Sequence, residues 1–281
     1  MKISVIVATY NWPSALRLSL QSLMRQTAHN FEIVVADDGS RNETRELIES
    51  LAKSSPVPII HSWQEDIGFR LARSRNQAVL KSHGDYLIFV DGDCIVPKDF
   101  VANHLKLAAS GKVVAGPRIL LTKPYSMDLQ NKSVVPWSNF DHAGGALRLW
   151  FRGCSNRWMQ AISLPIGGLR DLIAPLRWQH LRGCNWALYK NDFLSVNGLD
   201  ESFEGWGQED SDMVIRLINN EVHLRTGRYG GIPVFHLWHR QVIREGEYEK
   251  KALLMERLEK KLCGLLRGFI DNFLKSTHNF V

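Results

Sequence analysis

Strand-length apolar runs alternate with stretches of helical spacing at the start of this chain, and that alternation restricts its fold more than any other feature. Ile3–Ala8 and Phe31–Ala36 are β-branched runs, and the leucines of Ser14–Gln26 between them recur at helical spacing. Glu43–Ala52 and Leu71–Lys81 read as two further helices. These segments predict consecutive βαβ units.

The alternation continues up to residue 90. Val57–His61 has the length of a strand, and Tyr86–Val90 is a continuous apolar run of the kind found in strands buried on both faces. Repeated strand–helix units form mostly parallel sheets with helices on both sides. We therefore predict an α/β fold with a Rossmann-like, doubly wound, mostly parallel sheet.

The character of the sequence changes in residues 119–182, which we treat as an insert. From about Leu147 onward this insert is rich in arginine and aromatic residues, and Asp171 is its one acidic residue there. After the insert, the pattern predicts strands at Trp186–Tyr189 and Pro233–Trp238 and helices at Ser211–Asn220 and Glu247 to about Leu274. We divide the chain into a main domain, 1–240, with halves 1–118 and 183–240 around the insert, and an amphipathic helical extension, 241–281.

Composition and charge restrict the partners. The 281 residues are 44% hydrophobic and 23% charged, as in an ordinary globular protein. No apolar run reaches the roughly 18 residues of a membrane span, and the four scattered cysteines form no C-x-x-C pair. We expect a cytoplasmic protein, soluble or peripheral on the membrane's inner face. The net charge of +6 suits a phosphate-bearing ligand or an anionic membrane, whereas no nucleic-acid-reading module is recognisable.

Polar clusters follow each of the first four predicted strands. In doubly wound sheets, ligands bind beyond the carboxyl ends of the strands. The clusters are Thr9-Tyr10-Asn11, Asp37-Asp38, Gln64-Glu65-Asp66 and Asp91-Gly92-Asp93.

The Asp91-Gly92-Asp93 triplet indicates a metal site. Glycine permits a tight turn while two carboxylates converge, and Mg²⁺ or Mn²⁺ bound by one or two carboxylates keeps positions open for substrate phosphates. A plain turn is the simpler interpretation, but the position after a buried strand favours metal. His236 and His239 follow a later strand, and we select His236 over His239 as a further protein ligand.

The other strand ends suit a nucleotide. Asp38 could accept the imide N–H of uracil, with Thr9 and Asn11 beside the base or ribose. Arg70 and Arg75 lie at a helix start, where guanidinium groups could meet a diphosphate. The alternatives are a turn leading into a helix at Asp38 and solvated arginines on a helix face.

A second acidic cluster, Phe203 to Asp212, opens the helix predicted near Met213. Acids in a first helical turn often only offset the helix dipole. Gly205 and Gly207 around Trp206, however, allow close backbone approach beside a ring on which a sugar can stack. A carboxylate there could act as a general base.

Several motifs resemble those of family 2 glycosyltransferases with the GT-A fold. They are Ser4 to Asn11, Val34 to Ser40, Ala72 to Asn76 and Val90 to Asp93. The later segment Gly205-Trp206-Gly207-Gln208-Glu209-Asp210 resembles the G-W-G-x-E-D segment of β-1,4-galactosyltransferases and bacterial chondroitin polymerases. Ser211 departs from that pattern, which commonly carries another acid at this position.

The resemblance implies an inverting hexosyltransferase that uses a nucleotide-sugar, usually UDP-linked, and Mn²⁺ or Mg²⁺. It implies Asp38 near the base, Asp91 near the ribose or metal, Asp93 and His236 as metal ligands, and Asp210 as general base. The expected donor-binding residues are Thr9, Tyr10, Asn11, Asp38, Arg70, Arg75, Asp91 and Gly92, and the expected acceptor-binding residues are Trp206, Gly207 and Glu209.

With these assignments, residues 1–118 form the donor half and 183–240 the acceptor half. We expect the acceptor to be a glycan or lipid-linked glycan, as in bacterial surface polysaccharide or lipopolysaccharide synthesis. Two alternatives stay open. A sugar nucleotidyltransferase would need a Gly-rich phosphate loop after the first strand, which Thr9-Tyr10-Asn11-Trp12-Pro13 is not. A non-catalytic glycan-binding or scaffold protein would not need the paired acids.

Overall fold

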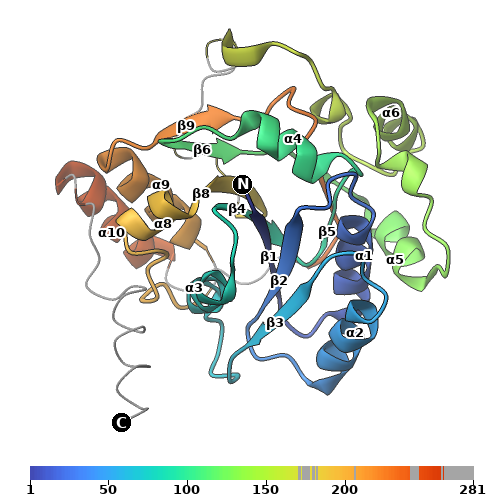
Figure 1. Ribbon diagram of the computed structural model, residues 1–281, viewed down its shortest axis with the longest axis horizontal. Helices are drawn as coiled ribbons and strands as arrows, with labels where there is room; N and C mark the ends of the chain where they lie inside the picture. Colours follow the sequence, from blue (N-terminus) through green and yellow to red (C-terminus); the bar gives the residue numbers. More distant parts are fainter. Residues whose placement is uncertain are drawn as a thin grey trace.

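Two sheets form the framework of the computed structural model, which describes residues 1–169, 172, 178, 181, 183–205, 207–240, 247–260 and 262. The larger sheet has seven strands in the order β3-β2-β1-β4-β8-β6-β9, and the smaller has the order β5-β10-β7. Figure 1 shows helices on both sides of the larger sheet.

The strands are β1 Ile3–Thr9, β2 Phe31–Asp37, β3 Ile59–Trp63, β4 Tyr86–Asp91, β5 Cys94–Ile95, β6 Lys112–Ala115, β7 Arg118–Leu120, β8 Asn185–Tyr189, β9 His223–Thr226 and β10 Val234–His236. The helices are α1 Pro13–Met24, α2 Asn42–Ala52, α3 Leu71–Lys81, α4 Phe100–Leu107, α5 Lys123–Asn131, α6 Ala143–Phe151, α8 Lys190–Ser195, α9 Glu209–Asn219 and α10 Glu247–Lys260.

The predicted parallel core is confirmed. β1 lies between β2 and β4 and runs parallel to both, with Thr9 opposite Asp37 and Ala8 opposite Asp91. β3 continues the parallel set on the far side of β2. β8 is reversed, since it pairs antiparallel with both β4 and β6. The carboxyl ends of β1, β2, β3 and β4 therefore meet at one edge of the sheet.

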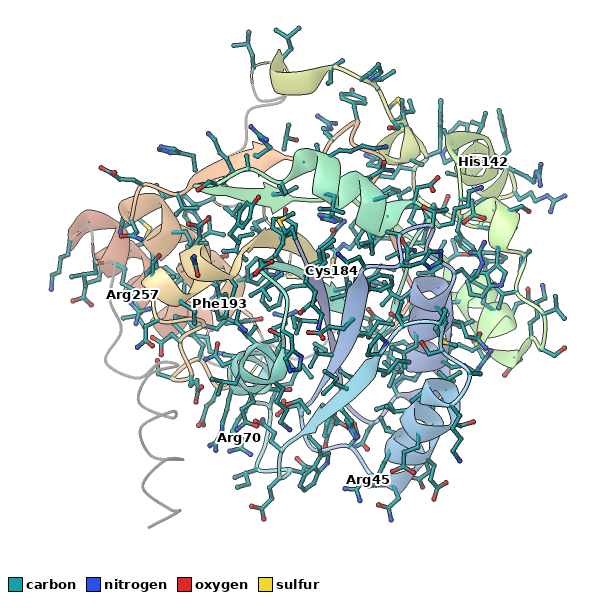
Figure 2. All side chains as sticks on the ribbon, in the orientation of Figure 1. Arg45, Arg70, His142, Cys184, Phe193 and Arg257 are labelled. Carbon is teal, nitrogen blue, oxygen red and sulfur yellow. The ribbon has the colours of Figure 1, made fainter. Side chains whose placement is uncertain are left out.

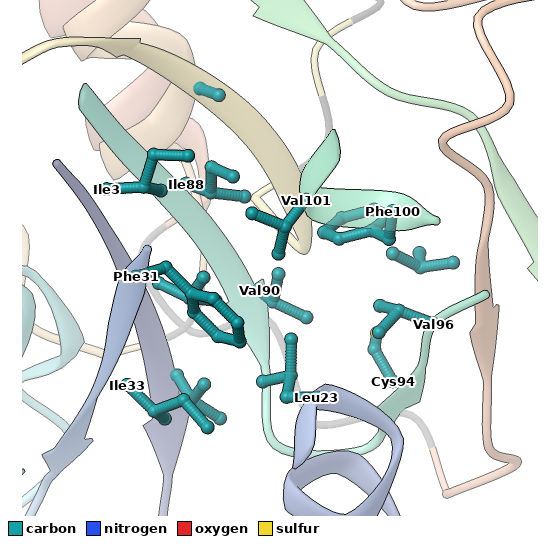
Figure 3. Packing of buried hydrophobic residues seen from close by; sticks show 14 of the residues in the cluster. Ile3, Leu23, Phe31, Ile33, Ile88, Val90, Cys94, Val96, Phe100 and Val101 are labelled. Carbon is teal, nitrogen blue, oxygen red and sulfur yellow. The ribbon is translucent and has the colours of Figure 1, made fainter. Parts of the chain in front are cut away.

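Side chains of β1 alternate between two cores, one on each face of the sheet. Val5 and Val7 pack with Leu16, Leu20 and Leu23 of α1 and with residues of α2 and α4, part of which Figure 3 shows. Ile6 packs on the opposite face with residues of α3, α8 and α9. Burial on both faces explains why these strands read as continuous apolar runs.

The insert packs around the smaller sheet. Apolar residues of α5 and α6 form a third core with α1, β7 and β10, and it includes Leu129, Phe140, Ala146, Leu149 and Phe235. The domain divisions at residues 118, 182 and 240 stay predictions.

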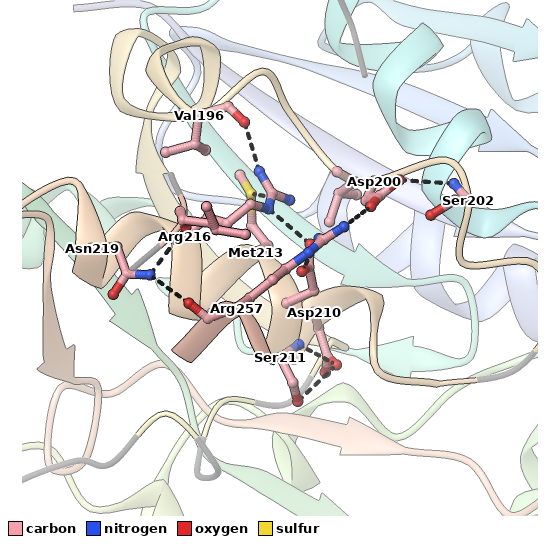
Figure 4. Close-up of polar contacts among 12 residues, drawn as sticks. Val196, Asp200, Ser202, Asp210, Ser211, Met213, Arg216, Asn219 and Arg257 are labelled. Atoms are coloured by element: carbon pink, nitrogen blue, oxygen red, sulfur yellow. Dashed lines mark hydrogen bonds and ion pairs between the residues drawn. The ribbon is translucent and has the colours of Figure 1, made fainter. Parts of the chain in front are cut away.

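The helix predicted to begin at Glu247 does begin there and is described up to Lys260, and the part expected to reach Leu274 lies outside the described residues, apart from Leu262. The Arg257 side chain of α10 pairs with Asp212 at the start of α9 and with Asp200 in the preceding loop. Arg216 pairs with the other oxygen of Asp212 at 2.8 Å and donates to the Val196 carbonyl. Figure 4 shows that this buried network fastens α10 to α9.

Helix α9 begins at Glu209, two residues earlier than predicted. Glu209, Asp210 and Asp212 lie in its first turn, where carboxylates offset the positive end of the helix dipole. Helix α9 thus carries the predicted base. Within the described ranges, no helix combines the length and apolar character needed to cross a bilayer.

Candidate active site

Asp93, His236 and His239 form a compact cluster beside the end of β4. β5 follows directly after Asp93 and pairs antiparallel with β10, so His236 lies opposite Cys94. The backbone N–H of Leu237 donates to the Asp93 carbonyl at 2.9 Å. These pairings bring the His236 Nε2 to 3.5 Å and the His239 Nε2 to 3.7 Å from one Asp93 carboxylate oxygen.

Both imidazoles are oriented as metal ligands. The Nδ1 of His236 contacts the Leu237 carbonyl at 2.7 Å, and the Nδ1 of His239 contacts the Arg240 carbonyl at 2.7 Å. A carbonyl only accepts, so each Nδ1 carries the proton and each Nε2 keeps its lone pair towards Asp93. Their potential ligand atoms lie within 4.8 Å of one another. The two-histidine, one-carboxylate set supports a divalent cation, and it includes His239 as well as the predicted His236.

Burial raises the pKa of Asp93, and the neighbouring histidines partly offset this effect. A carboxylate withdrawn from water gains a strong partner when a cation arrives. This environment fits the predicted role of Asp93 as a metal ligand.

Arg75 joins the triplet at the end of β4 to the acidic start of α9. It is 1% exposed. Its guanidinium donates to the Asp91 carboxylate at 2.7 Å and to the Gly183 carbonyl at 2.9 Å, and lies 3.6 Å from the Glu209 carboxylate. A diphosphate contact from Arg75 stays a prediction, because these contacts make it a bridge between the two acidic clusters.

Glu209 and Asp210 differ in their access to solvent. Glu209 is 6% exposed and faces Arg75, and its second carboxylate oxygen has no hydrogen-bond partner within the described part of the chain. Asp210 keeps part of its surface in solvent, and one of its oxygens accepts from the Ser211 backbone N–H at 2.7 Å. A substrate hydroxyl can therefore reach Asp210 more readily than Glu209.

Burial raises the pKa values of both acids. Burial is the larger cause for Glu209, followed by the charge of Asp210, and its pKa rises to about 7. Burial also raises the pKa of Asp210, while the backbone N–H groups of Ser211 and Gly183 and the charge of Arg75 lower it. Paired carboxyls with raised pKa values are typical of acid–base sites.

The Gly183 backbone lies close to the side chains of Asp210 and Arg75. A Cβ added there would lie 3.3 Å from an Asp210 carboxylate oxygen and 3.6 Å from an Arg75 nitrogen. Gly183 was not among the residues predicted from the sequence. Its signal is a glycine shortly before a central strand, which marks close approach of backbone to another group.

Asp38 lies at the other end of the same edge. It is 4% exposed, and its carboxylate accepts from the Arg70 backbone N–H at 2.7 Å and from the Gln64 amide at 2.5 Å. Burial raises its pKa despite these two donors. Asp38 therefore holds the loop before α3 in place, and a base contact would use its remaining lone pairs.

The residues after β1 support the neighbouring turn. The Thr9 carbonyl accepts from the Asp38 backbone N–H at 3.0 Å, and the Asn11 side chain accepts from the Arg41 backbone N–H at 2.9 Å. The Tyr10 ring is 47% exposed, and its hydroxyl donates to Asp66 at 3.0 Å. Of the predicted donor residues here, Tyr10 offers the most accessible surface.

Glycines shape both ends of the site. A Cβ at Gly92 would lie 2.8 Å from the Ala8 carbonyl, so only glycine fits the turn between Asp91 and Asp93. Gly207 has a φ of 88° and open space where a side chain would be. Trp206, the predicted stacking surface for a sugar, lies outside the described residues.

Comparison with solved structures identifies chains that share this architecture. The chain resembles Staphylococcus aureus TarS in complex with UDP-GlcNAc, with a TM-score of 0.59, 19% identity, and coverage of 93% of this chain and 69% of that one. It also resembles GalNAc-T7 with UDP, GalNAc and Mn²⁺, with a TM-score of 0.60, 14% identity, and coverage of 91% and 48%. At these identities the likeness shows the fold, which is GT-A as predicted.

Sequence relatives include a validoxylamine A glucosyltransferase of Streptomyces hygroscopicus subsp. jinggangensis, 28% identical over 237 residues, or 80% of this chain and 53% of that protein. Chondroitin synthase of Escherichia coli is 28% identical over 235 residues, or 80% of this chain and 33% of that protein. The chain thus spans about half the length, or less, of these relatives.

Protein-family sequence models divide the chain at the insert. Residues 168–239 match the N-terminal domain of galactosyltransferase, consistent with the resemblance noted around Gly205 to Asp210. Residues 4–163, more than half of the chain, match glycosyl transferase family 2. The chain belongs to glycosyl transferase family 2.

Proposed function

We propose that this protein is a metal-dependent, inverting glycosyltransferase that moves a hexose from a UDP-sugar to a hydroxyl of a glycan acceptor. One observation carries the proposal: the Asp93, His236 and His239 cluster and the acid pair of α9 lie at the same sheet edge, joined through Asp91 and Arg75. A metal-binding donor site and a base for the acceptor are the two parts that such a transfer needs.

Asp210 is the general base in this proposal. It is the more accessible acid, and burial raises its pKa, which makes its carboxylate a stronger proton acceptor than that of an ordinary aspartate. The acceptor oxygen loses its proton to Asp210 and attacks the anomeric carbon from the face opposite the departing nucleoside diphosphate. The bond to the diphosphate breaks as the new glycosidic bond forms, so the configuration inverts. Glu209, whose second oxygen has no hydrogen-bond partner among the described residues, orients the acceptor hydroxyls.

Arg75 positions the carboxylates on either side of it. Its contacts hold Asp91 and Glu209 and leave the Asp93 carboxylate for the cation. When bound, a divalent cation supplies positive charge that stabilises the departing diphosphate.

The donor edge fits a nucleotide. Asp38, Thr9 and Asn11 hold the turns after β1 and β2 in fixed conformations, and Tyr10 and Arg70 lie beside them. Support for a UDP-linked sugar comes from the TarS and GalNAc-T7 structures, which contain UDP or UDP-GlcNAc. Support for a glycan acceptor, as in surface polysaccharide or lipopolysaccharide synthesis, comes from the similarity to chondroitin synthase.

A donor screen tests the proposal directly. Purified protein is incubated with UDP-, GDP- and other nucleotide-sugars, with Mn²⁺, with Mg²⁺ and with chelator, and donor binding and slow hydrolysis are measured. We expect one UDP-sugar to respond and the response to vanish with chelator. Binding of a glycan without any nucleotide-sugar would favour the scaffold alternative, and release of pyrophosphate from a sugar phosphate and a nucleoside triphosphate would favour a nucleotidyltransferase.

Asp210→Asn tests the base. This near-isosteric change removes the proton acceptor, so we expect kcat to fall about 10²- to 10⁴-fold while the Kd for donor stays within about twofold. Glu209→Gln, which keeps a hydrogen-bonding group beside Arg75, serves as the matched control and should mainly raise the acceptor KM. Equal kcat for Asp210→Asn and wild type would remove Asp210 from the mechanism.

A further inference from the structure

The end of α6 and the turn after it expose aromatic and basic side chains together. Trp150 is 42% and Phe151 74% exposed, and their ring centroids lie 5.0 Å apart. Arg148, Arg152 and Arg157 are also exposed, and Met159 is 59% exposed. We call the exposed residues Arg148, Trp150, Phe151, Arg152, Arg157 and Met159 the basic aromatic edge.

The position of α6 explains why this edge is open. Gly145, Ala146 and Leu149 face the third core, so the opposite side of the helix has nothing packed on it in the described part of the chain. Figure 1 shows α6 at the periphery of the molecule, and Figure 2 shows side chains pointing outward there, beside the labelled His142.

Charge is concentrated in the same stretch. Residues 142–170 contain four arginines and no aspartate, glutamate or lysine, so this stretch carries +4 of the net charge of +6. Further along it, Leu164 is 43% and Leu169 63% exposed. Large apolar residues that are exposed close together mark a surface that interacts with a partner or a membrane.

We propose that the basic aromatic edge rests on the anionic face of a phospholipid bilayer. Tryptophan and phenylalanine fit the boundary between headgroups and acyl chains, and arginines beside them pair with lipid phosphates. A second copy of the chain fits this edge poorly, since it would bring the same positive charge against itself. The inference is independent of the proposed reaction, because in the described part of the chain none of these residues makes a hydrogen bond, ion pair or ring contact with the candidate active site.

Vesicle co-sedimentation tests the proposal on the full chain. We expect binding to phosphatidylcholine vesicles that contain phosphatidylglycerol, weak binding to phosphatidylcholine alone, and weakening by salt. The triple variant Arg148→Gln, Arg152→Gln, Arg157→Gln should bind roughly 100-fold more weakly, because each basic residue at an anionic surface contributes about fivefold. Trp150→Ser with Phe151→Ser should also weaken binding while leaving its salt dependence in place.

A matched control removes three exposed lysines elsewhere: Lys53→Gln, Lys81→Gln and Lys106→Gln. It lowers the net charge equally and should retain vesicle binding. The proposal is overturned if wild type does not bind anionic vesicles, if the control loses as much binding as the arginine variant, or if soluble polygalacturonate binds this edge while vesicles do not. Donor binding, measured on the same preparations, shows that each variant is folded and tests the proposed function separately.

Discussion

His236 and His239 differ in exposure but present the same nitrogen to Asp93. The side chain of His236 is 9% exposed and that of His239 37%. The spacing of the two histidines along the chain did not predict that both would be metal ligands. The turn that brings His239 back towards Asp93 has no regular sequence pattern.

Alanine substitution of each histidine measures its share in metal binding. We expect His236→Ala and His239→Ala each to weaken Mn²⁺ binding at least tenfold, because each removes one of three protein ligands. Isothermal titration calorimetry with Mn²⁺ alone gives the Kd. Unchanged affinity for His239→Ala would restrict the site to Asp93 and His236.

His104 is a titratable group in the core, away from the site. It packs edge-on against Phe100 with centroids 4.5 Å apart, and burial lowers its pKa to about 3. Its ring is therefore neutral in the folded protein, whereas it takes up a proton below about pH 6.5 when unfolded.

The lowered pKa predicts a loss of stability in acid. Between pH 6.5 and 3 the unfolded chain binds one more proton at His104 than the folded chain does, so the free energy of unfolding decreases as the pH is lowered. His104 accounts for a decrease of about 2 kcal/mol between pH 7 and pH 5. In His104→Leu that contribution should be absent. Urea unfolding at both pH values measures it, and an equal acid loss in the variant would contradict the assignment.

At the scale of elements, α10 is held to α9 by charge as much as by apolar contact. Leu254 packs with Phe203 and Ile215, while Arg257 reaches Asp200 and Asp212. Because Asp212 lies two residues after Asp210, this contact also fixes the first turn of α9.

Arg257→Leu should lower the free energy of unfolding by roughly 2–3 kcal/mol, since it leaves Asp200 and one oxygen of Asp212 buried without their partner while Arg216 keeps the other. Lys260→Leu, which breaks an exposed pair with Glu256, is the control and should have no measurable effect. Chemical denaturation measures both. A loss confined to activity, without destabilisation, would instead assign Arg257 a direct role at the site.

The long buried strands were predictable, and so was the short β10, whereas four other short strands were not. Val5, Ile33 and Ile88 belong to runs whose burial on both faces leaves a clear apolar signal. β5, β6, β7 and β9, of two to four residues, depend on pairing partners far along the chain and carry no local pattern. For the same reason the polar residues after β1 and the carboxylates after β2 and β4 could be located in advance, whereas the Arg75 bridge and the approach of Gly183 could not.

At the scale of the whole molecule, the candidate metal site joins the two sheets. Asp93 follows β4 of the larger sheet, and His236 ends β10 of the smaller one, about half the chain away in sequence. A cation held by both would reinforce the β5–β10 pairing and the hydrogen bond from the Leu237 N–H to the Asp93 carbonyl, which already join these segments.

Mn²⁺ should therefore raise the melting temperature. At a concentration 100 times its Kd, a ligand that binds only the folded state adds about 2.7 kcal/mol, or roughly 5–10 °C for a chain of this size. Differential scanning fluorimetry measures the shift, and Asp93→Asn should abolish it. A similar shift in that variant would place the cation elsewhere.

The reversed strand β8 also has an evolutionary consequence. The chain leaves the larger sheet after β6 and re-enters at Asn185, which pairs with Val90 beside the site. The intervening segment thus leaves and re-enters the larger sheet through the neighbouring strands β6 and β8, at the same edge of that sheet. Insertions, deletions or wholesale exchange of this segment leave the order and register of the seven strands intact. Divergence among related proteins should accordingly accumulate there, and grafting the segment between relatives is the natural route to altering what such a protein associates with.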